Sequence, residues 1–131
     1  MINLATLTGA VIVALGHENA GLFANDDNFV GDILKAAKAE GEGAWHMPLQ
    51  PAYDKELKSR LADVRNVGGR SGGAIIAAAF LKRFVRDEVP WCHIDIAGVA
   101  LPPSATDLAP KGPTGWGVMT LDRLIRDRFE A

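Results

Sequence analysis

The chain has 131 residues, of which 48% are hydrophobic and 23% charged, so it is long enough for one globular domain or a part of one. Its formal net charge of −2 at pH 7 excludes the strongly basic surface that a nucleic-acid-binding protein carries. The single cysteine, Cys92, cannot form an internal disulfide, and a reducing cytoplasm is the simplest compartment for such a chain.

The N-terminal tract NLATLTGA, residues 3–10, consists of small and β-branched residues and ends in a glycine turn. It predicts a buried strand of the kind that lies inside a larger α/β domain. Because it follows Met1 almost directly, we expect the chain to be the back part of a longer protein. Polar Asn3, Thr6 and Thr8 argue against a membrane span, and the stretch lacks the preceding Lys or Arg of a signal peptide.

Apolar stretches in the first part of the chain predict strands. Residues 2–8 and residues 10–15 are apolar segments broken by Gly9, which we interpret as two strand segments. The stretch GLFAN at 21–25 predicts a further short strand.

A helix is predicted to follow, capped at its start by Asp26 or Asp27 and ended by Gly41. One face of this helix is apolar and is formed by Phe29, Val30, Ile33, Leu34 and Ala37. Such a face packs against a sheet or another helix. WHMPL at 45–49 then predicts an extended connector.

The middle of the chain predicts two helices separated by glycines. Pro51 suits the first turn of a helix that runs to about Leu61. A glycine-rich loop follows at 66–73. The run AIIAAAFLKRFV at 74–85 is the clearest helix of the sequence, with basic residues near its C-terminal end.

The last third predicts a buried strand over Trp91 to Val99, a proline-rich loop over 101–113 and a final helix over 118–129. That helix carries Leu121, Leu124 and Ile125 on one face. Strands and helices therefore alternate along the chain, which predicts the α/β class.

Residues 69–73, Gly-Arg-Ser-Gly-Gly, match the G-x-S-x-G pattern of a serine-hydrolase nucleophile and precede a helix. A nucleophilic Ser71 needs an acidic residue and then a histidine downstream. The only acidic residues between Ser71 and His93 are Asp87 and Glu88, which lie very close to the histidine in sequence. We favour a glycine hinge that lets the helix start pack against backbone, while a generic anion site on the same glycines stays open.

The histidines, the cysteine and the carboxylates show no metal-ligand spacing, so we expect no metal site in this chain. Cys92 and His93 are neighbours on a predicted strand and point to opposite faces. His93 and Asp95 share a face, and we expect them to form a buried hydrogen-bonded pair.

The order of motifs resembles the leucine aminopeptidase family, also called leucyl or cytosol aminopeptidases. The stretches that carry the resemblance cover nearly the whole chain in order, and they are specific together although each is weak alone. They are NLATLTGA at 3–10, ALG at 14–16, AGLFAN at 20–25, WHMPL at 45–49, SRLADVRN at 59–66, GGAIIAAAFLKRFV at 72–85, WCHIDIAG at 91–98 and PTGWGV at 113–118.

The resemblance implies that residues 1–131 are the C-terminal portion of an aminopeptidase catalytic domain, a part of a mixed central sheet flanked by helices and truncated at its N-terminal side. Family members are cytoplasmic, hexameric exopeptidases that remove N-terminal residues from peptides with two divalent metals, Zn²⁺ or Mn²⁺. The family's metal ligands and catalytic Arg and Lys belong to motifs upstream of the tract that opens this chain. The resemblance therefore implies no metal ligand and no catalytic residue here, and an inactive chain on its own.

The resemblance does imply substrate-binding residues. Thr6, Leu7 and Gly9 match the strand end whose backbone meets the substrate, and a glycine there is expected to let backbone approach closely. Ala97 matches a position that lines the pocket for the N-terminal side chain, and Ala100 falls at a neighbouring one. Small residues at these positions leave room for an apolar side chain.

The sequence departs from the family pattern at four positions, with Asn3 at a frequent Asp, His46 at a usual Arg, Pro113 at a usual Ala and Met119 at a common Arg. These departures bear on local salt bridges and subunit contacts more than on the fold. A non-catalytic interaction or assembly module on the same scaffold is the alternative interpretation. A serine hydrolase using Ser71 is a third.

Overall fold

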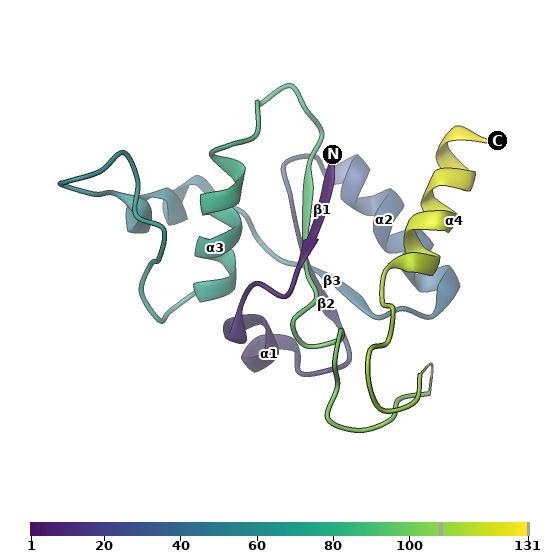
Figure 1. The fold of residues 1–131 in the computed structure, drawn as a ribbon. Coiled ribbons are helices and arrows are strands. Elements are labelled where there is room, and N and C mark those ends of the chain that lie inside the picture. Colours follow the sequence, from purple (N-terminus) through teal and green to yellow (C-terminus); the bar gives the residue numbers. More distant parts are fainter. Residues whose placement is uncertain (108, 131) are drawn as a thin grey trace.

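The computed structural model describes residues 1–107 and 109–130 (Figure 1). Leu108, within the predicted loop 101–113, and Ala131 lie outside the described residues. The elements in chain order are β1 (Ile2–Ala5), α1 (Gly9–Leu15), β2 (Ala20–Ala24), α2 (Asp27–Glu40), β3 (Ala44–His46), the 3₁₀ helix η1 (Pro51–Leu57), α3 (Gly73–Lys82), β4 (Cys92–Asp95) and α4 (Val118–Phe129).

The four strands form one mixed sheet in the order β1-β4-β2-β3. Strands β1 and β4 are parallel, β2 and β3 are parallel, and β4 and β2 are antiparallel. Helices cover both faces of this sheet (Figure 1). The predicted α/β class and the mixed central sheet flanked by helices are therefore confirmed.

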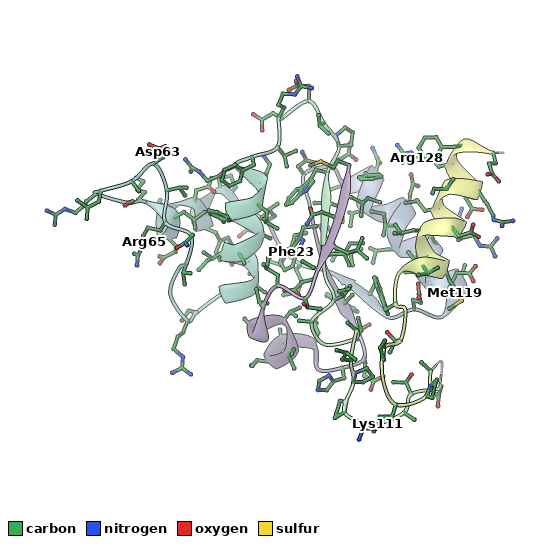
Figure 2. All side chains as sticks on the ribbon, in the orientation of Figure 1. Phe23, Asp63, Arg65, Lys111, Met119 and Arg128 are labelled. Atoms are coloured by element: carbon green, nitrogen blue, oxygen red, sulfur yellow. The ribbon has the colours of Figure 1, made fainter. Side chains whose placement is uncertain are left out.

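Side chains that alternate along β2 and β4 separate two cores. Leu22, Cys92 and Ile94 pack toward α2 and α4 with Val30 and Leu124. The opposite face of the sheet, toward α1 and α3, holds a second cluster that contains Val11, Phe23, Ala74, Ile75 and Ala78. Figure 2 shows Phe23 at the centre of the molecule, beside the sheet.

Helix α2 forms as its end signals predict. The Asp26 carboxylate accepts a 2.8 Å hydrogen bond from the Phe29 amide, which satisfies one of the free amides at the helix start. Gly41 ends the helix in the left-handed region at φ 73°, where a side chain would be strained. The predicted bounds of α4, residues 118–129, are likewise confirmed.

The predicted strand over residues 10–15 is wrong, because Gly9–Leu15 is the helix α1. The run is apolar throughout, so its pattern does not distinguish a strand from a short helix. The Thr8 hydroxyl decides the outcome by accepting a 3.0 Å hydrogen bond from the Val11 amide at the helix start.

Strand β1 is shorter and less buried than the sequence predicts. It ends at Ala5, its residues are half-buried, and it lies at the edge of the four-stranded sheet. Strand β4 likewise covers only four residues of the predicted Trp91–Val99, yet all four are buried. Burial of β4 follows from its position between β1 and β2 in the sheet.

Two further predicted helices differ in extent. The segment that starts at Pro51 is a 3₁₀ helix ending at Leu57, where the Arg65 amide donates a 2.8 Å hydrogen bond to the Leu57 carbonyl. Helix α3 ends at Lys82 and not at 85. Among residues 1–107 and 109–130, no helix has the length and apolar character that crossing a membrane requires.

Candidate functional site

The carboxyl ends of β1 and β4 lie side by side. The two strands are parallel, with Ala5 opposite Asp95, so the chain leaves the sheet at the same edge in both places. Ligands of open α/β sheets bind beyond the carboxyl ends of strands. We call the residues that follow these strands the first segment (6–9) and the second segment (96–100).

The five residues for which the resemblance implies substrate contact lie in these two segments. Thr6, Leu7 and Gly9 are exposed on the first segment, and Ala97 and Ala100 are half-buried on the second. Leu7 and Gly9 also border a groove of about 430 Å³ on the side of the glycine-rich loop. Ala97 and Ala100 are not among the residues that line this groove.

Asp95 is fully buried and connects the two segments. Its Oδ1 accepts hydrogen bonds from the Leu7 amide at 3.1 Å and from the Ala97 amide at 3.2 Å. Its Oδ2 accepts a 2.7 Å hydrogen bond from the Thr8 hydroxyl. The same hydroxyl caps α1, so one carboxylate organises both segments and the start of a helix.

The second segment also contacts the far end of α1. The His17 imidazole donates a 2.7 Å hydrogen bond from Nδ1 to the Gly98 carbonyl. A Cβ added at Gly98 would lie 2.2 Å from the Gly16 carbonyl oxygen, so only glycine permits this approach. Both ends of helix α1 therefore contact β4 or the residues that follow it. Its start contacts Asp95 through Thr8, and the residues after its end contact Gly98.

The backbone conformation at position 9 does not require a glycine. Its φ is not positive, and an added Cβ would meet no atom of the described residues within 4 Å. Open space beside an exposed glycine leaves room for a molecule outside this part of the chain. A side chain at this position would extend into that space.

His93 and Asp95 are both fully buried, but the predicted hydrogen bond between them is wrong. His93 Nδ1 instead accepts a 2.8 Å hydrogen bond from the Asn3 side-chain amide, while Asn3 Oδ1 accepts one from Trp91 Nε1 at 2.8 Å. A carboxylate is an acceptor only and could not donate to His93 as this amide does. Asn3 thus links two neighbouring side chains.

The environment of His93 favours its neutral form. Burial lowers the pKa of the imidazole, and the nearby Asp95 carboxylate opposes this only in part. The ring is stacked with Phe23 and with Trp91, whose centroids lie 5.9 Å and 6.4 Å away. Its Nε2 is buried without a hydrogen-bond partner among the described residues.

Cys92 lacks the properties of a reactive or metal-binding thiol. The side chain is fully buried, and burial raises its pKa to about 12. The thiolate is the nucleophile and the metal ligand, and this environment disfavours it. Among the described residues, no three His, Cys, Asp or Glu side chains gather in a way that could hold a metal ion.

The glycine-rich loop lies close to α3 and the first residue of α3 lies close to α1, but both approaches are to side chains, whereas the hinge interpretation expected packing against backbone. A Cβ at Gly68 would lie 2.5 Å from Ile76 Cγ2, and one at Gly73 would lie 3.1 Å from Ala10 Cβ. Helix α3 starts after Gly72, which has a φ of 65° and offers no side-chain cap. Ser71 is exposed and is not the cap of the helix.

The loop before Gly68 extends away from the sheet. Figure 2 shows Asp63 and Arg65 on this loop, on the far side of α3 from the strands. Asp63 and Arg65 therefore lie apart from the carboxyl ends of β1 and β4, whereas Asn66 lines the same groove as Leu7 and Gly9. For Asp63 and Arg65, this position argues against a direct role beside the first segment.

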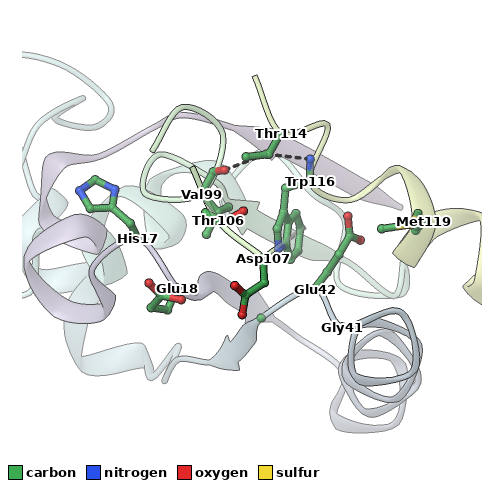
Figure 3. Close-up of a pocket in the computed structure, with 11 residues that line it drawn as sticks. His17, Glu18, Gly41, Glu42, Val99, Thr106, Asp107, Thr114, Trp116 and Met119 are labelled. Carbon is green, nitrogen blue, oxygen red and sulfur yellow. Dashed lines mark hydrogen bonds between the residues drawn. The ribbon is translucent and has the colours of Figure 1, made fainter. Parts of the chain in front are cut away.

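A second buried carboxylate, Glu42, lies beside a cavity of about 200 Å³ whose lining includes Val99 of the second segment (Figure 3). Glu42 accepts hydrogen bonds from the Gly117 amide and the Thr120 amide, both at 2.9 Å, and from the Thr120 hydroxyl. These groups form the start of α4. The cavity wall also contains Trp116 and Asp107.

The roles of Asp95, Thr8 and Glu42 were missed at the level of sequence. Each depends on a partner far along the chain, 75 residues or more away for both carboxylates. No local pattern marks these partners. The remaining departures from the family pattern lie near the surface, with Pro113 and Met119 exposed.

Comparison with known proteins supports one family. Residues 1–122 match the catalytic domain of the cytosol aminopeptidase family. The "Probable cytosol aminopeptidase" of Dinoroseobacter shibae is 68% identical over 130 residues, 99% of this chain and 27% of that protein. The protein of the same name from Cereibacter sphaeroides is 65% identical, again over 99% of this chain and 27% of its own length.

A solved structure agrees with this result. A mutant of tomato leucine aminopeptidase superposes with a TM-score of 0.90 and 42% sequence identity, over 97% of this chain and 24% of that chain. The chain thus spans about a quarter of the length of the proteins that it matches.

Proposed function

The chain belongs to the cytosol aminopeptidase family, and we propose that residues 1–131 form the C-terminal portion of the catalytic domain of an enzyme that hydrolyses N-terminal peptide bonds. In this proposal the chain supplies a wall of the substrate pocket and contacts between subunits of a homo-oligomer, a hexamer as the resemblance implies. The substrate is a peptide, and the cytoplasm is the compartment that the names of the relatives suggest.

One observation carries the proposal. The segments that contain Thr6, Leu7, Gly9, Ala97 and Ala100 leave the sheet at the same edge, and a single carboxylate accepts hydrogen bonds from both. Exposed backbone on the first segment can exchange hydrogen bonds with an extended peptide. The two alanines on the second segment leave space for an apolar N-terminal side chain.

The metals of the reaction belong to residues outside this chain in our proposal. Two divalent ions, Zn²⁺ or Mn²⁺, would polarise the scissile carbonyl and activate a water molecule. The buried side chains of Asp95 and Cys92 do not fit such a centre, since both Asp95 oxygens accept hydrogen bonds and burial raises the Cys92 pKa to about 12. We therefore expect the isolated chain to be inactive.

A non-catalytic interaction or assembly module is the second candidate function. Helix α4 exposes large apolar side chains, with Val118 at 69% and Phe129 at 73% exposure. Such residues favour contact with another protein surface. This candidate predicts that changes in the first segment leave activity of the assembled protein unaltered.

A chimaera tests the first candidate against the second. The region of the Dinoroseobacter shibae relative that matches residues 1–131 is replaced by this chain, and hydrolysis of leucine amide is measured. We expect Gly9→Val to lower kcat/KM about 100-fold, because a displacement of substrate by about 1 Å can cost that much. An inactive parent chimaera would contradict the proposed aminopeptidase function.

Gly31→Val is the matched control for this experiment. Gly31 is an exposed helical glycine without positive φ, and a Cβ there would also meet no described atom within 4 Å. Both variants should melt within a few degrees of the parent, since valine has a slightly better helix propensity than glycine and neither new side chain meets a described atom. Near-parent kcat/KM in a folded Gly9→Val chimaera would refute the assignment of residues 6–9 to the pocket wall.

A further inference from the structure

Backbone pairing between β1 and β4 stops where the two segments begin. The last hydrogen bond of this pairing runs from the Ile96 amide to the Ala5 carbonyl at 2.9 Å. Within the described residues, no backbone hydrogen bond joins residues 6–9 to residues 96–100. The relative placement of the two segments therefore depends on side chains.

The Asp95 carboxylate supplies this connection. Amides from both segments, those of Leu7 and Ala97, donate to the same oxygen, Oδ1. A shared acceptor holds the two amide nitrogens close to each other at distances that the hydrogen bonds define. Because Asp95 lies on β4 and is fully buried, the acceptor itself is fixed by the sheet.

Thr8 extends the connection into α1. Its hydroxyl donates to Asp95 Oδ2 at 2.7 Å and accepts from the Val11 amide at 3.0 Å. A hydroxyl has one hydrogen, which is donated to Asp95, and its oxygen accepts the hydrogen bond from Val11. The orientation of the helix start and the position of the first segment are thereby coupled to one carboxylate.

We propose that Asp95 is a positioning residue that sets the distance between the first and second segments and so the width of the pocket for the N-terminal side chain. This inference rests on the proposed function, since it assumes that these segments form the pocket wall. Asp95 acts through Leu7 and Ala97 and does not itself touch the substrate. Thr8 supports it by orienting the carboxylate.

The ratio of kcat/KM for leucine amide to kcat/KM for alanine amide reports pocket width in the active chimaera. Loss of folded enzyme lowers both values equally and leaves the ratio unchanged, so a merely structural role does not alter it. Asp95→Asn keeps the shape of the side chain but turns one acceptor into a donor that faces the Thr8 hydroxyl. We expect the ratio to change about tenfold or more, with the larger loss on leucine amide.

Asp87→Asn is the matched control, because it makes the same chemical change at a side chain that is 93% exposed. We expect it to leave both rate constants and their ratio at the parent values. Thr8→Val removes the supporting hydroxyl and should shift the ratio in the same direction as Asp95→Asn. Thr8→Ser restores the hydroxyl and should return the ratio to within about threefold of the parent.

The outcomes separate the inference from the function on which it rests. An inactive parent chimaera contradicts both. An active parent whose Asp95→Asn and Thr8→Val variants keep the parent ratio, at whatever absolute rate, refutes the positioning role and leaves the aminopeptidase function standing. A changed ratio that Thr8→Ser restores supports the positioning role.

Discussion

Asp95 and Glu42 accept the same kinds of hydrogen bonds in two different parts of the molecule. Each is a buried carboxylate that accepts hydrogen bonds from two backbone amides and one threonine hydroxyl, that of Thr8 or that of Thr120. Charged acceptors form stronger hydrogen bonds than neutral ones, and removal of the acceptor leaves buried donors unsatisfied. Both carboxylates should therefore contribute strongly to stability.

What differs is the structure that each carboxylate organises. Glu42 lies just after α2 and takes over the capping of α4, whose own N-cap, Gly117, has a φ of 97° and no side chain. It joins two helices that cover one face of the sheet. Asp95 lies within a central strand and joins the first segment, which is largely exposed, to the second segment, which is half-buried or buried. One type of polar cluster thus serves helix docking in one place and, in our proposal, pocket shape in the other.

The largest effect is expected from Asp95→Ala in the chimaera. The Leu7 and Ala97 amides and the Thr8 hydroxyl lose their acceptor at once, so the free energy of unfolding should fall by about 3 kcal/mol. Hydrolysis of leucine amide should also fall, by more than in Asp95→Asn. Denaturant unfolding together with steady-state kinetics checks both. An unfolding free energy within about 0.5 kcal/mol of the parent would show that these hydrogen bonds are absent.

Glu42→Ala should produce a smaller and purely structural effect. Loss of the charged cap of α4 should cost about 2 kcal/mol, and hydrogen exchange should quicken along this helix. The ratio of rates on leucine and alanine amides should stay at the parent value, because the Glu42 carboxylate accepts its hydrogen bonds from Gly117 and Thr120 and from neither segment of the pocket wall. A ratio that changed as in Asp95→Asn would remove the distinction between the two carboxylates.

Ser71→Ala should have the smallest effect and gives the baseline for both clusters. Ser71 is exposed and does not cap α3, so its loss should change the free energy of unfolding by less than about 0.5 kcal/mol. Activity on amide and ester substrates should match that of the parent. Loss of ester hydrolysis with an unchanged melting temperature would instead favour a serine hydrolase.

Elements with signals inside their own sequence were predicted well. Helix α2 carries a capping Asp26, a periodic apolar face and a terminal Gly41, and helix α4 has a similar apolar face. Residues 10–15 carry no such period, and the strand predicted there is a helix. The hydrogen bond expected between His93 and Asp95 also failed, because sharing a strand face does not decide which of several neighbours a side chain meets.

The candidate site shows the same division. Family motifs pointed to Thr6, Leu7, Gly9, Ala97 and Ala100, and whether these residues bind substrate remains a prediction. The sequence by itself determined the α/β class, the helices with end signals and the family, because these depend on local periodicity, caps and motif order. Only the tertiary structure decided that Asp95 meets Leu7 and Thr8 and that Glu42 meets α4. Such contacts join residues distant in sequence, and the packing of the sheet and helices selects each partner.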